Sequence, residues 1–218
     1  MRVWPFGRKQ DVEPKEPEPE EETGDSLVDF LDWGIRLGTM GKSERAIEQF
    51  KRALAQDPDD VAACYNLALA LDQAGRSEEA VEHYRRATEL APDSANITAS
   101  FGAALIAVGR YEEAADLLAA ATETTRDDEA LHFNLGCASM RLDRFKDAVN
   151  SFRLAVEADP KQPETRFNLA IALRKAGCPD LAENELRDFL ALAGEKYADQ
   201  RLYAQHLLDT EYCDKEIS

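Results

Sequence analysis

Residues 61–94 read VAACYNLALALDQAGRSEEAVEHYRRATELAPDS, and they contain the pattern that the rest of the chain repeats. Gly75 permits a reversal of the chain, and the helical pattern that follows it continues until Pro92. Before Gly75, apolar and small residues recur at i, i+3, i+4 and i+7, which indicates one face of a helix. These residues are Cys64, Leu67, Ala68 and Leu71. One such helix pair cannot bury its own apolar face, so the pattern predicts neighbouring pairs.

The same landmarks return at a period of 34 residues, in the copies 27–60, 61–94, 95–128, 129–162 and 163–196. Ala80, for example, recurs as Ala46, Ala114, Ala148 and Ala182. The pattern resembles the tetratricopeptide repeat (TPR), and the resemblance covers almost all of residues 27–196. It implies an all-α fold, a right-handed α-solenoid of antiparallel helix pairs. We expect helices near 27–40 and 43–56, 60–73 and 77–90, 94–108 and 111–124, 128–141 and 145–158, and 162–175 and 179–192.

Two segments flank the repeats. Residues 1–26 are rich in Pro and Glu and poor in apolar residues, so we expect a disordered N-terminal tail. In residues 197–218 we expect a capping helix over the apolar face of the fifth repeat, followed by a short tail. Its helical stripe consists of Leu202, Tyr203, His206 and Leu207.

The net charge and the spacing of the cysteines argue against several classes of protein. The 218 residues include 26 Lys and Arg against 43 Asp and Glu, a formal charge of −17, which argues against nucleic acid as a partner because phosphates would be repelled. The four cysteines show neither CxxC spacing nor paired His ligands, which argues against a zinc site or a disulfide framework. No apolar run is long enough to span a membrane, and the first residues lack a secretory apolar core, so we expect a cytoplasmic protein.

No catalytic motif is apparent. There is no Gly-rich phosphate loop after a strand, no HExxH and no nucleophile elbow. Acid pairs such as Glu78-Glu79 lie at expected helix starts, where negative charge meets the positive end of the helix dipole. The three histidines lie in different elements without metal ligands at a suitable spacing. We therefore expect no enzymatic activity, no metal and no cofactor.

The resemblance implies that the first helix of each repeat lines a concave groove with its positions two, five, six, nine, twelve and thirteen. An aromatic residue beside an Asn recurs there, and an amide can pair with an extended peptide while the ring covers apolar side chains. The candidate partner-binding residues are Tyr65, Asn66, Leu69, Gln73, Phe133, Asn134, Met140, Arg141, Phe167, Asn168, Ile171, Arg174 and Lys175. We expect a protein–protein interaction scaffold that binds partner segments and organises a complex.

Charge within the groove refines this expectation. TPR proteins that clamp chaperone C-terminal carboxylates carry Lys and Asn in the first copy and basic residues in the third. The matching positions here are Leu31, Ile35, Asn96 and Ser100, which excludes that subtype. The C-terminal half of the groove is expected to be cationic and to favour an acidic segment, through Arg141, Arg166, Arg174 and Lys175. The chain's own Glu16–Glu22 is a candidate, folded back or supplied by a neighbouring molecule.

Two alternatives remain open from the sequence. Trp4 and Phe6, flanked by basic residues, could anchor a membrane-associated assembly factor, although an ordinary unstructured terminus explains them too. A regulator or sensor that closes on a ligand would need a hinge. If repeats three and four pack weakly, the hinge lies between them. The repeat pattern departs there, because Arg126 replaces the usual Pro and Asp143 replaces the turn Gly.

Overall fold

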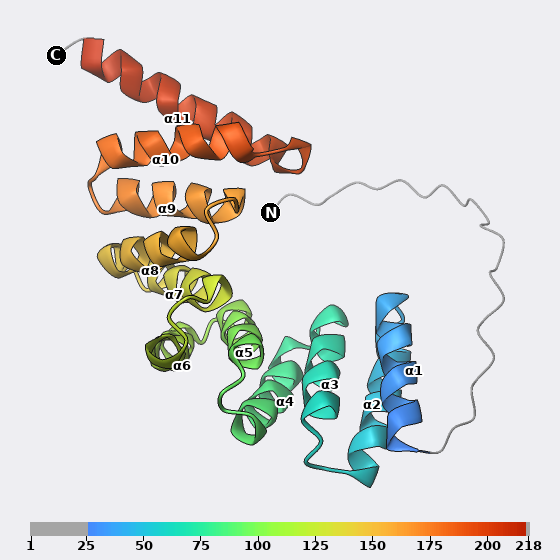
Figure 1. Ribbon diagram of the computed structural model, residues 1–218. Coiled ribbons are helices and arrows are strands. Elements are labelled where there is room, and N and C mark those ends of the chain that lie inside the picture. The colour runs from blue at the N-terminus through green and yellow to red at the C-terminus, as the bar shows by residue number, and fades with distance from the viewer. Residues whose placement is uncertain (1–25, 217–218) are drawn as a thin grey trace, which may run out of the picture.

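The computed structural model describes residues 26–216, with side chains up to Asp209. Between residues 26 and 216 the chain is helical and contains no strand, and the helices follow one another in antiparallel pairs along a curved superhelix (Figure 1). The elements are α1 (Leu27–Thr39), α2 (Ser43–Gln56), α3 (Val61–Gln73), α4 (Ser77–Leu90), α5 (Ala95–Ala107), α6 (Tyr111–Thr124), α7 (Glu129–Arg141), α8 (Phe145–Ala158), α9 (Pro163–Lys175), α10 (Pro179–Leu192), the 3₁₀ turn η1 (Glu195–Tyr197) and α11 (Ala198–Glu216).

Side-chain caps fix where several helices begin. Ser26 forms a capping box with Asp29 at the start of α1. Asp60 and Asp128 each accept a backbone N–H of the following helix, at 2.6 Å and 2.9 Å. The N-cap of α4 is Arg76, and its side chain forms no capping bond. The first helix of each later pair starts one residue after its expected position, and in α3 and α7 the extra residue is one of these aspartate caps.

The turn inside each repeat requires a left-handed backbone. Gly75 has a φ of 76°, and glycine adopts this region without a steric penalty. Asp143 occupies the equivalent turn of the fourth repeat with a φ of 55°, which is strained for a residue with a Cβ.

The first helices lie on the inner side of the curve and the second helices on its outer side, as Figure 1 shows for α3, α5 and α7 against α4, α6 and α8. Glycine lets the two helices of a pair approach closely. A Cβ on Gly136 would lie 2.6 Å from Cε1 of Phe152, and a Cβ on Gly102 would lie 2.6 Å from Cδ2 of Leu118. The pairs are therefore packed as tightly as their side chains allow.

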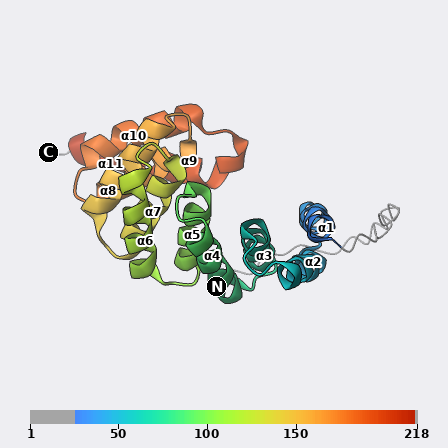
Figure 2. The same ribbon diagram turned by 60° about the horizontal axis from the view of Figure 1, so that its bottom comes forward.

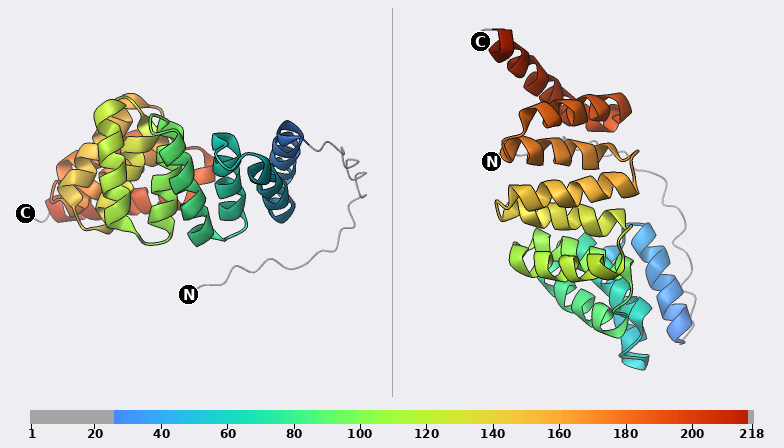
Figure 3. Two further views of the ribbon diagram at one scale, coloured as in Figure 1. Left: turned by 90° about the horizontal axis from the view of Figure 1, so that it is seen from below. Right: turned by 60° about the vertical axis from the view of Figure 1, so that its left-hand side comes forward.

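The buried residues form two main cores that meet at α7. The first core runs from α1 through Leu131 and Ala138 of α7. The second spans α8 to α11, and Phe133, Cys137 and Met140 on another face of α7 pack against it. Helix α7 thus contributes one face to each core. Figure 2 and the left view of Figure 3 show the pairs α1–α2 and α3–α4 at one end of the array, away from the C-terminal helices.

The junction between repeats three and four is closely packed, and a hinge there stays a prediction. Helices α5 and α7 touch directly, and the Asn134 amide donates to the carbonyl of Ala99 at 3.0 Å. The His132 ring nitrogen Nε2 donates to the carbonyl of Arg126 at 2.7 Å and holds the loop before α7. The small Ala99 is 5% exposed, which allows the inner helices to come together. This close approach bends the array at α5 and α7.

Helix α11 contacts α10 (Figure 3, right), and its buried face matches the expected stripe only in part. Ala204 and Leu207 are buried in the second core. Leu202 and Tyr203 are 72% and 51% exposed, although the Tyr203 ring still lies 6.3 Å from the Phe167 ring of the fifth repeat. Of the four stripe residues, Leu207 is buried and the other three are exposed, while Tyr197 of η1 takes a place in the same core.

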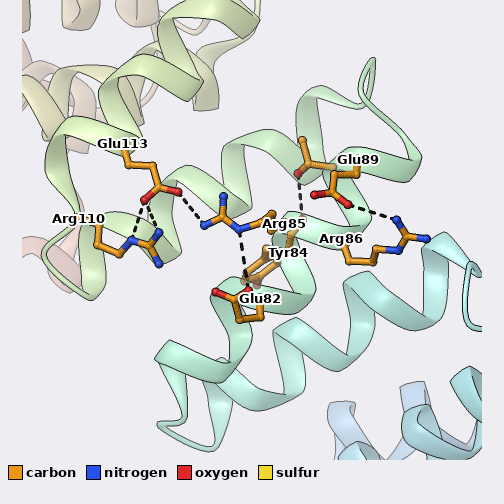
Figure 4. Close-up of polar contacts among 8 residues, drawn as sticks. Glu82, Tyr84, Arg85, Arg86, Glu89, Arg110 and Glu113 are labelled. Carbon is orange, nitrogen blue, oxygen red and sulfur yellow. Dashed lines mark hydrogen bonds and ion pairs between the residues drawn. The ribbon is translucent and has the colours of Figure 1, made fainter.

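Ion pairs between outer helices join successive repeats. Arg85 of α4 and Arg110 before α6 both bind the carboxylate of Glu113, the former at 2.8 Å (Figure 4). Arg85 donates the first of these bonds, and together they lower the pKa of Glu113. Glu113 therefore stays ionised below the usual range for glutamate and ties the second repeat to the third.

Candidate partner-binding groove

The candidate groove is the face of each inner helix that stays at least partly exposed. In α3, the residues that pack in the core are Ala63, Cys64, Leu67, Ala68, Ala70 and Leu71. Tyr65, Asn66 and Leu69 are half-buried and Gln73 is exposed. The predicted residues of α7 and α9 occupy repeat positions equivalent to residues 65–73 of α3. Their role in binding stays a prediction.

An apolar ladder runs along this surface at position nine of the five inner helices. Its members are Ile35, Leu69, Ala103, Cys137 and Ile171, spaced 34 residues apart. Ile35 is 44% exposed, Ala103 is exposed and the other three are half-buried. The ladder thus repeats one apolar or small residue on each inner helix from α1 to α9, a spacing that can receive apolar side chains of a bound segment.

The aromatic residues of the groove rest on the second helices. Tyr65 packs edge-on against Tyr84 with ring centroids 6.0 Å apart, and its hydroxyl contacts the Ser100 hydroxyl at 3.2 Å. Phe167 lies 5.1 Å from Phe189 and 6.3 Å from Tyr203 of α11. Phe133 makes the same kind of contact with Phe152 at 5.8 Å. These contacts hold each ring in place, so the groove surface is formed before a partner arrives.

The groove asparagines donate to backbone carbonyls. Asn66 donates to Ala62 of its own helix at 2.8 Å, and Asn168 donates to Glu164 at 2.9 Å. Asn134 donates across to α5. The recurring Asn therefore has a structural role in addition to any contact with a peptide, and that role is invisible in the spacing pattern.

The C-terminal end of the groove has fewer unpaired cations than the sequence indicated. Arg166 contacts Glu185 at 2.9 Å and Asp188 at 3.2 Å, with 15% of its side chain exposed, so its charge is neutralised inside the fifth repeat. Arg141 is exposed, and its guanidinium lies 5.9 Å from the centre of the Tyr111 ring. Lys175 is exposed at the end of α9.

Lys175 also borders a surface depression between the α7–α8 turn and the end of α9. The depression is lined by Asp143, Arg144, Phe145, Lys146, Asp147, Lys175 and Ala176. Among the described residues, no carboxylate forms an ion pair with Arg141, Arg144, Lys146 or Lys175. We call these four residues the cationic rim. By contrast, α3 and α5 carry no Lys or Arg at all.

The metal-ligating and thiol side chains of the described residues are dispersed along the solenoid. Residues 26–209 contain no group of three His, Cys, Asp or Glu side chains placed to hold a metal ion. Burial raises the pKa of the Cys137 thiol to about 12, and it also raises the pKa of Cys64. Raised thiol pKa values suit packing residues, because a nucleophilic cysteine needs a lowered pKa.

The candidate binding residues taken from the sequence included none from α1, α5 or α11. Ala103 and Ala107 of α5 lie exposed in the middle of the groove, and their 34-residue spacing from named positions could have revealed them. Tyr203 reaches the groove beside Phe167 through the fold of α11, and no sequence signal places it there. Trp4 and Phe6, proposed as a membrane contact, lie outside the described residues. No helix in the described part of the chain is long and apolar enough to cross a membrane.

Comparison with known families decides the classification. Tetratricopeptide repeat profiles match residues 31–95 and, separately, residues 64–194. The chain belongs to the tetratricopeptide repeat family. A search of curated protein sequences finds no match for this TPR chain.

Solved TPR structures of similar fold include several described as MamA. "MamA 41-end from Desulfovibrio magneticus RS-1" is 20% identical with a TM-score of 0.70, and the match covers 78% of this chain and 96% of that one. "Crystal structure of MamA protein" is 21% identical with a TM-score of 0.70, covering 81% and 96%. "MamA MSR-1 C2" is 24% identical with a TM-score of 0.64, covering 76% and 95%. At these identities the likeness shows the fold alone.

Proposed function

We propose that this chain is a non-enzymatic scaffold that holds extended segments of partner proteins in its concave groove and so organises a complex. The apolar ladder from Ile35 to Ile171 is the observation that supports the proposal most strongly. Proteins of this family bind proteins or peptides. A ladder with one apolar residue per repeat suits an extended segment, which presents side chains at regular intervals along its length.

The groove is also pre-organised for such a segment. Its aromatic side chains are fixed by ring contacts, and its asparagine amides are fixed by backbone carbonyls, so little side-chain entropy is lost on binding. The proposed binding residues are those predicted from the sequence, together with Ile35, Ala103 and Ala107. The free thiols of Cys64, Cys137 and Cys178 favour a reducing compartment, and we therefore place the scaffold in the cytoplasm.

The test blocks the middle of the groove without disturbing the core. Ala103→Arg places a long charged side chain on the exposed face of α5, where alanine now leaves the groove open. Ala119→Arg makes the same change on an exposed position of the outer helix α6 and serves as the control. Both variants should retain the helical circular dichroism spectrum of the wild-type chain.

Affinity capture followed by quantitative mass spectrometry then compares the proteins bound by each variant. We expect Ala103→Arg to lose a defined set of partners that wild type and Ala119→Arg both retain. Each partner should then be reconstituted with purified components, and its contact segment mapped by crosslinking to α5 or α7. An identical partner set for all three proteins would refute the groove as the binding surface.

A further inference from the structure

The charge of the groove changes sign along its length. Toward its N-terminal end, the groove positions of α1 and α3 hold Asp32 and Asp72, and neither α3 nor α5 contributes a cation. Toward its C-terminal end lies the cationic rim, at the ends of α7 and α9 and the start of α8. The four cations of the rim outnumber the two carboxylates that line the adjoining depression, Asp143 and Asp147, so the rim favours acidic segments within a chain that is otherwise acidic.

The chain itself carries such a segment immediately before the first helix. Between Asp11 and Glu22 there are seven acidic residues and one Lys, interrupted by three prolines. Proline favours an extended backbone, which is the conformation that a groove of stacked helices accommodates. A tethered segment also has a high effective concentration near the groove, on the order of 1 mM for a short flexible linker.

The length of chain before α1 determines which residues of this segment can reach the cationic rim. Helices that pack about 10 Å apart place α7 roughly 30 Å along the stack from α1, and the length of α7 adds about 20 Å across the groove. The straight path is therefore about 36 Å, whereas the 13 residues from Glu13 to Ser26 span about 40–45 Å when extended. Asp11, Glu13 and Glu16 are far enough from α1 to approach the rim, and Glu20–Glu22 are too close to it.

We propose that residues 11–16 of this chain bind in cis against the cationic rim at the C-terminal end of the groove. The proposal rests on the proposed function, because it makes the tail a competitor of the partner segments that the groove receives. Asp32 and Asp72 disfavour the same contact at the other end of the groove. A partner must displace the tail to bind, so changes in tail charge control access to the scaffold.

Direct binding is measured with the truncated chain 26–218 and a fluorescent peptide of residues 9–25. We expect saturable binding in fluorescence anisotropy that weakens as salt is added. Replacing Arg141 and Lys175 by Glu should weaken it about tenfold, because two exposed attractive contacts become repulsive. The control is Arg153→Glu, an equal charge change at an exposed position of the outer helix α8, which should leave affinity unchanged. A peptide with Gln in place of its Asp and Glu residues should not bind.

Intramolecular occupancy is measured by comparing the full chain with the truncated one. If the free peptide binds with a Kd of about 0.1 mM, a tail at about 1 mM effective concentration should reduce its apparent affinity for the full chain about tenfold. Equal affinity for the two chains would overturn the proposal. So would binding that is indifferent to the Arg141 and Lys175 reversals. Light scattering should give a monomer mass at all concentrations, and a mass that rises for the full chain alone would assign the tail to a second copy instead.

These outcomes separate the two proposals. If Ala103→Arg abolishes partner capture but the peptide does not bind, the scaffold function stands and the tail contact fails. If the peptide binds at the rim but no partner depends on Ala103, the tail contact stands and the groove is not a partner-binding surface.

Discussion

Replacing Gly136 by Ala tests how tightly the helix pairs are packed. The added Cβ would lie 2.6 Å from Cε1, 2.7 Å from Cδ1 and 2.9 Å from Cζ of Phe152. The ring cannot simply swing away, since Phe152 is fully buried and packs edge-on against Phe133. The substitution must therefore push α7 and α8 apart or force the ring out of its preferred rotamer.

Two opposing effects set the size of the change in stability. Overpacking a well-packed core costs about 1–3 kcal/mol. Replacing glycine by alanine inside a helix stabilises the protein by about 0.5–1 kcal/mol, because glycine loses more conformational entropy when the helix forms. The expected net result is a loss of about 1 kcal/mol in the free energy of unfolding. A change of that size at a site with no surface contact is readily measured by urea unfolding.

The fifth repeat suggests how to relieve the strain. There, Ala170 and Leu186 occupy the positions of Gly136 and Phe152, and both are fully buried. Combining Gly136→Ala with Phe152→Leu should therefore be less destabilising than the sum of the single changes by about 1 kcal/mol. The control is Gly38→Ala in α1, where the new Cβ meets nothing within 4 Å, so stability should rise.

Urea unfolding monitored by circular dichroism gives these differences, and hydrogen exchange locates them in α7 and α8. Gly136→Ala would refute the steric reasoning if it raised stability as much as Gly38→Ala does. Additive behaviour of the double variant would refute it as well, because the two residues would then not be in limiting contact.

Three further changes probe the turn, the ion pairs and the thiols. Asp143→Gly should raise the free energy of unfolding by about 0.5 kcal/mol in urea, since glycine removes a strained φ; a lower value would contradict this. Arg85 holds the pKa of Glu113 below its ordinary value, so the stabilisation is full above that value and is lost as pH falls through the lower, folded pKa. Glu113→Gln should thus cost about 0.5 kcal/mol near pH 7 and nothing near pH 2, and a cost that persists in acid would contradict the linkage. With a pKa of about 12, Cys137 should react with iodoacetamide at least about tenfold more slowly than exposed Cys178 near pH 8, as peptide mapping would show.

Much of the fold follows from the sequence because each repeat contains the residues that begin and end its helices. The second helices begin and end where the spacing predicts, since a turn residue at one end and a loop at the other fix both limits. The first helices of the later pairs start one residue late, and in α3 and α7 that residue is an aspartate cap outside the helix. The buried face of α11 could be predicted only in part, since the place of Tyr197 of η1 in the same core depends on three-dimensional packing.

The candidate groove was predictable in outline and not in its details. A fixed period assigns Tyr65 or Ile171 to the inner face of the stack, because each repeat is a copy of the same helix pair. The period says nothing of hydrogen bonds that cross between repeats, such as the one from Asn134. It also could not show that carboxylates of the next helix neutralise Arg166, since side-chain pairing depends on three-dimensional packing.

The sharing of α7 by two cores also bears on the order in which a newly made chain acquires its shape. As the chain leaves the ribosome, the first core becomes complete when Leu131 and Ala138 emerge. At that moment Phe133, Cys137 and Met140 have no partners, because the second core that covers them is still unsynthesised. At this stage one face of α7 is packed in the first core, and another apolar face is still exposed to solvent. Helices α8 to α11 should then fold in sequence against this exposed face of α7. A stalled chain that ends near residue 141 should be the intermediate that chaperones recognise.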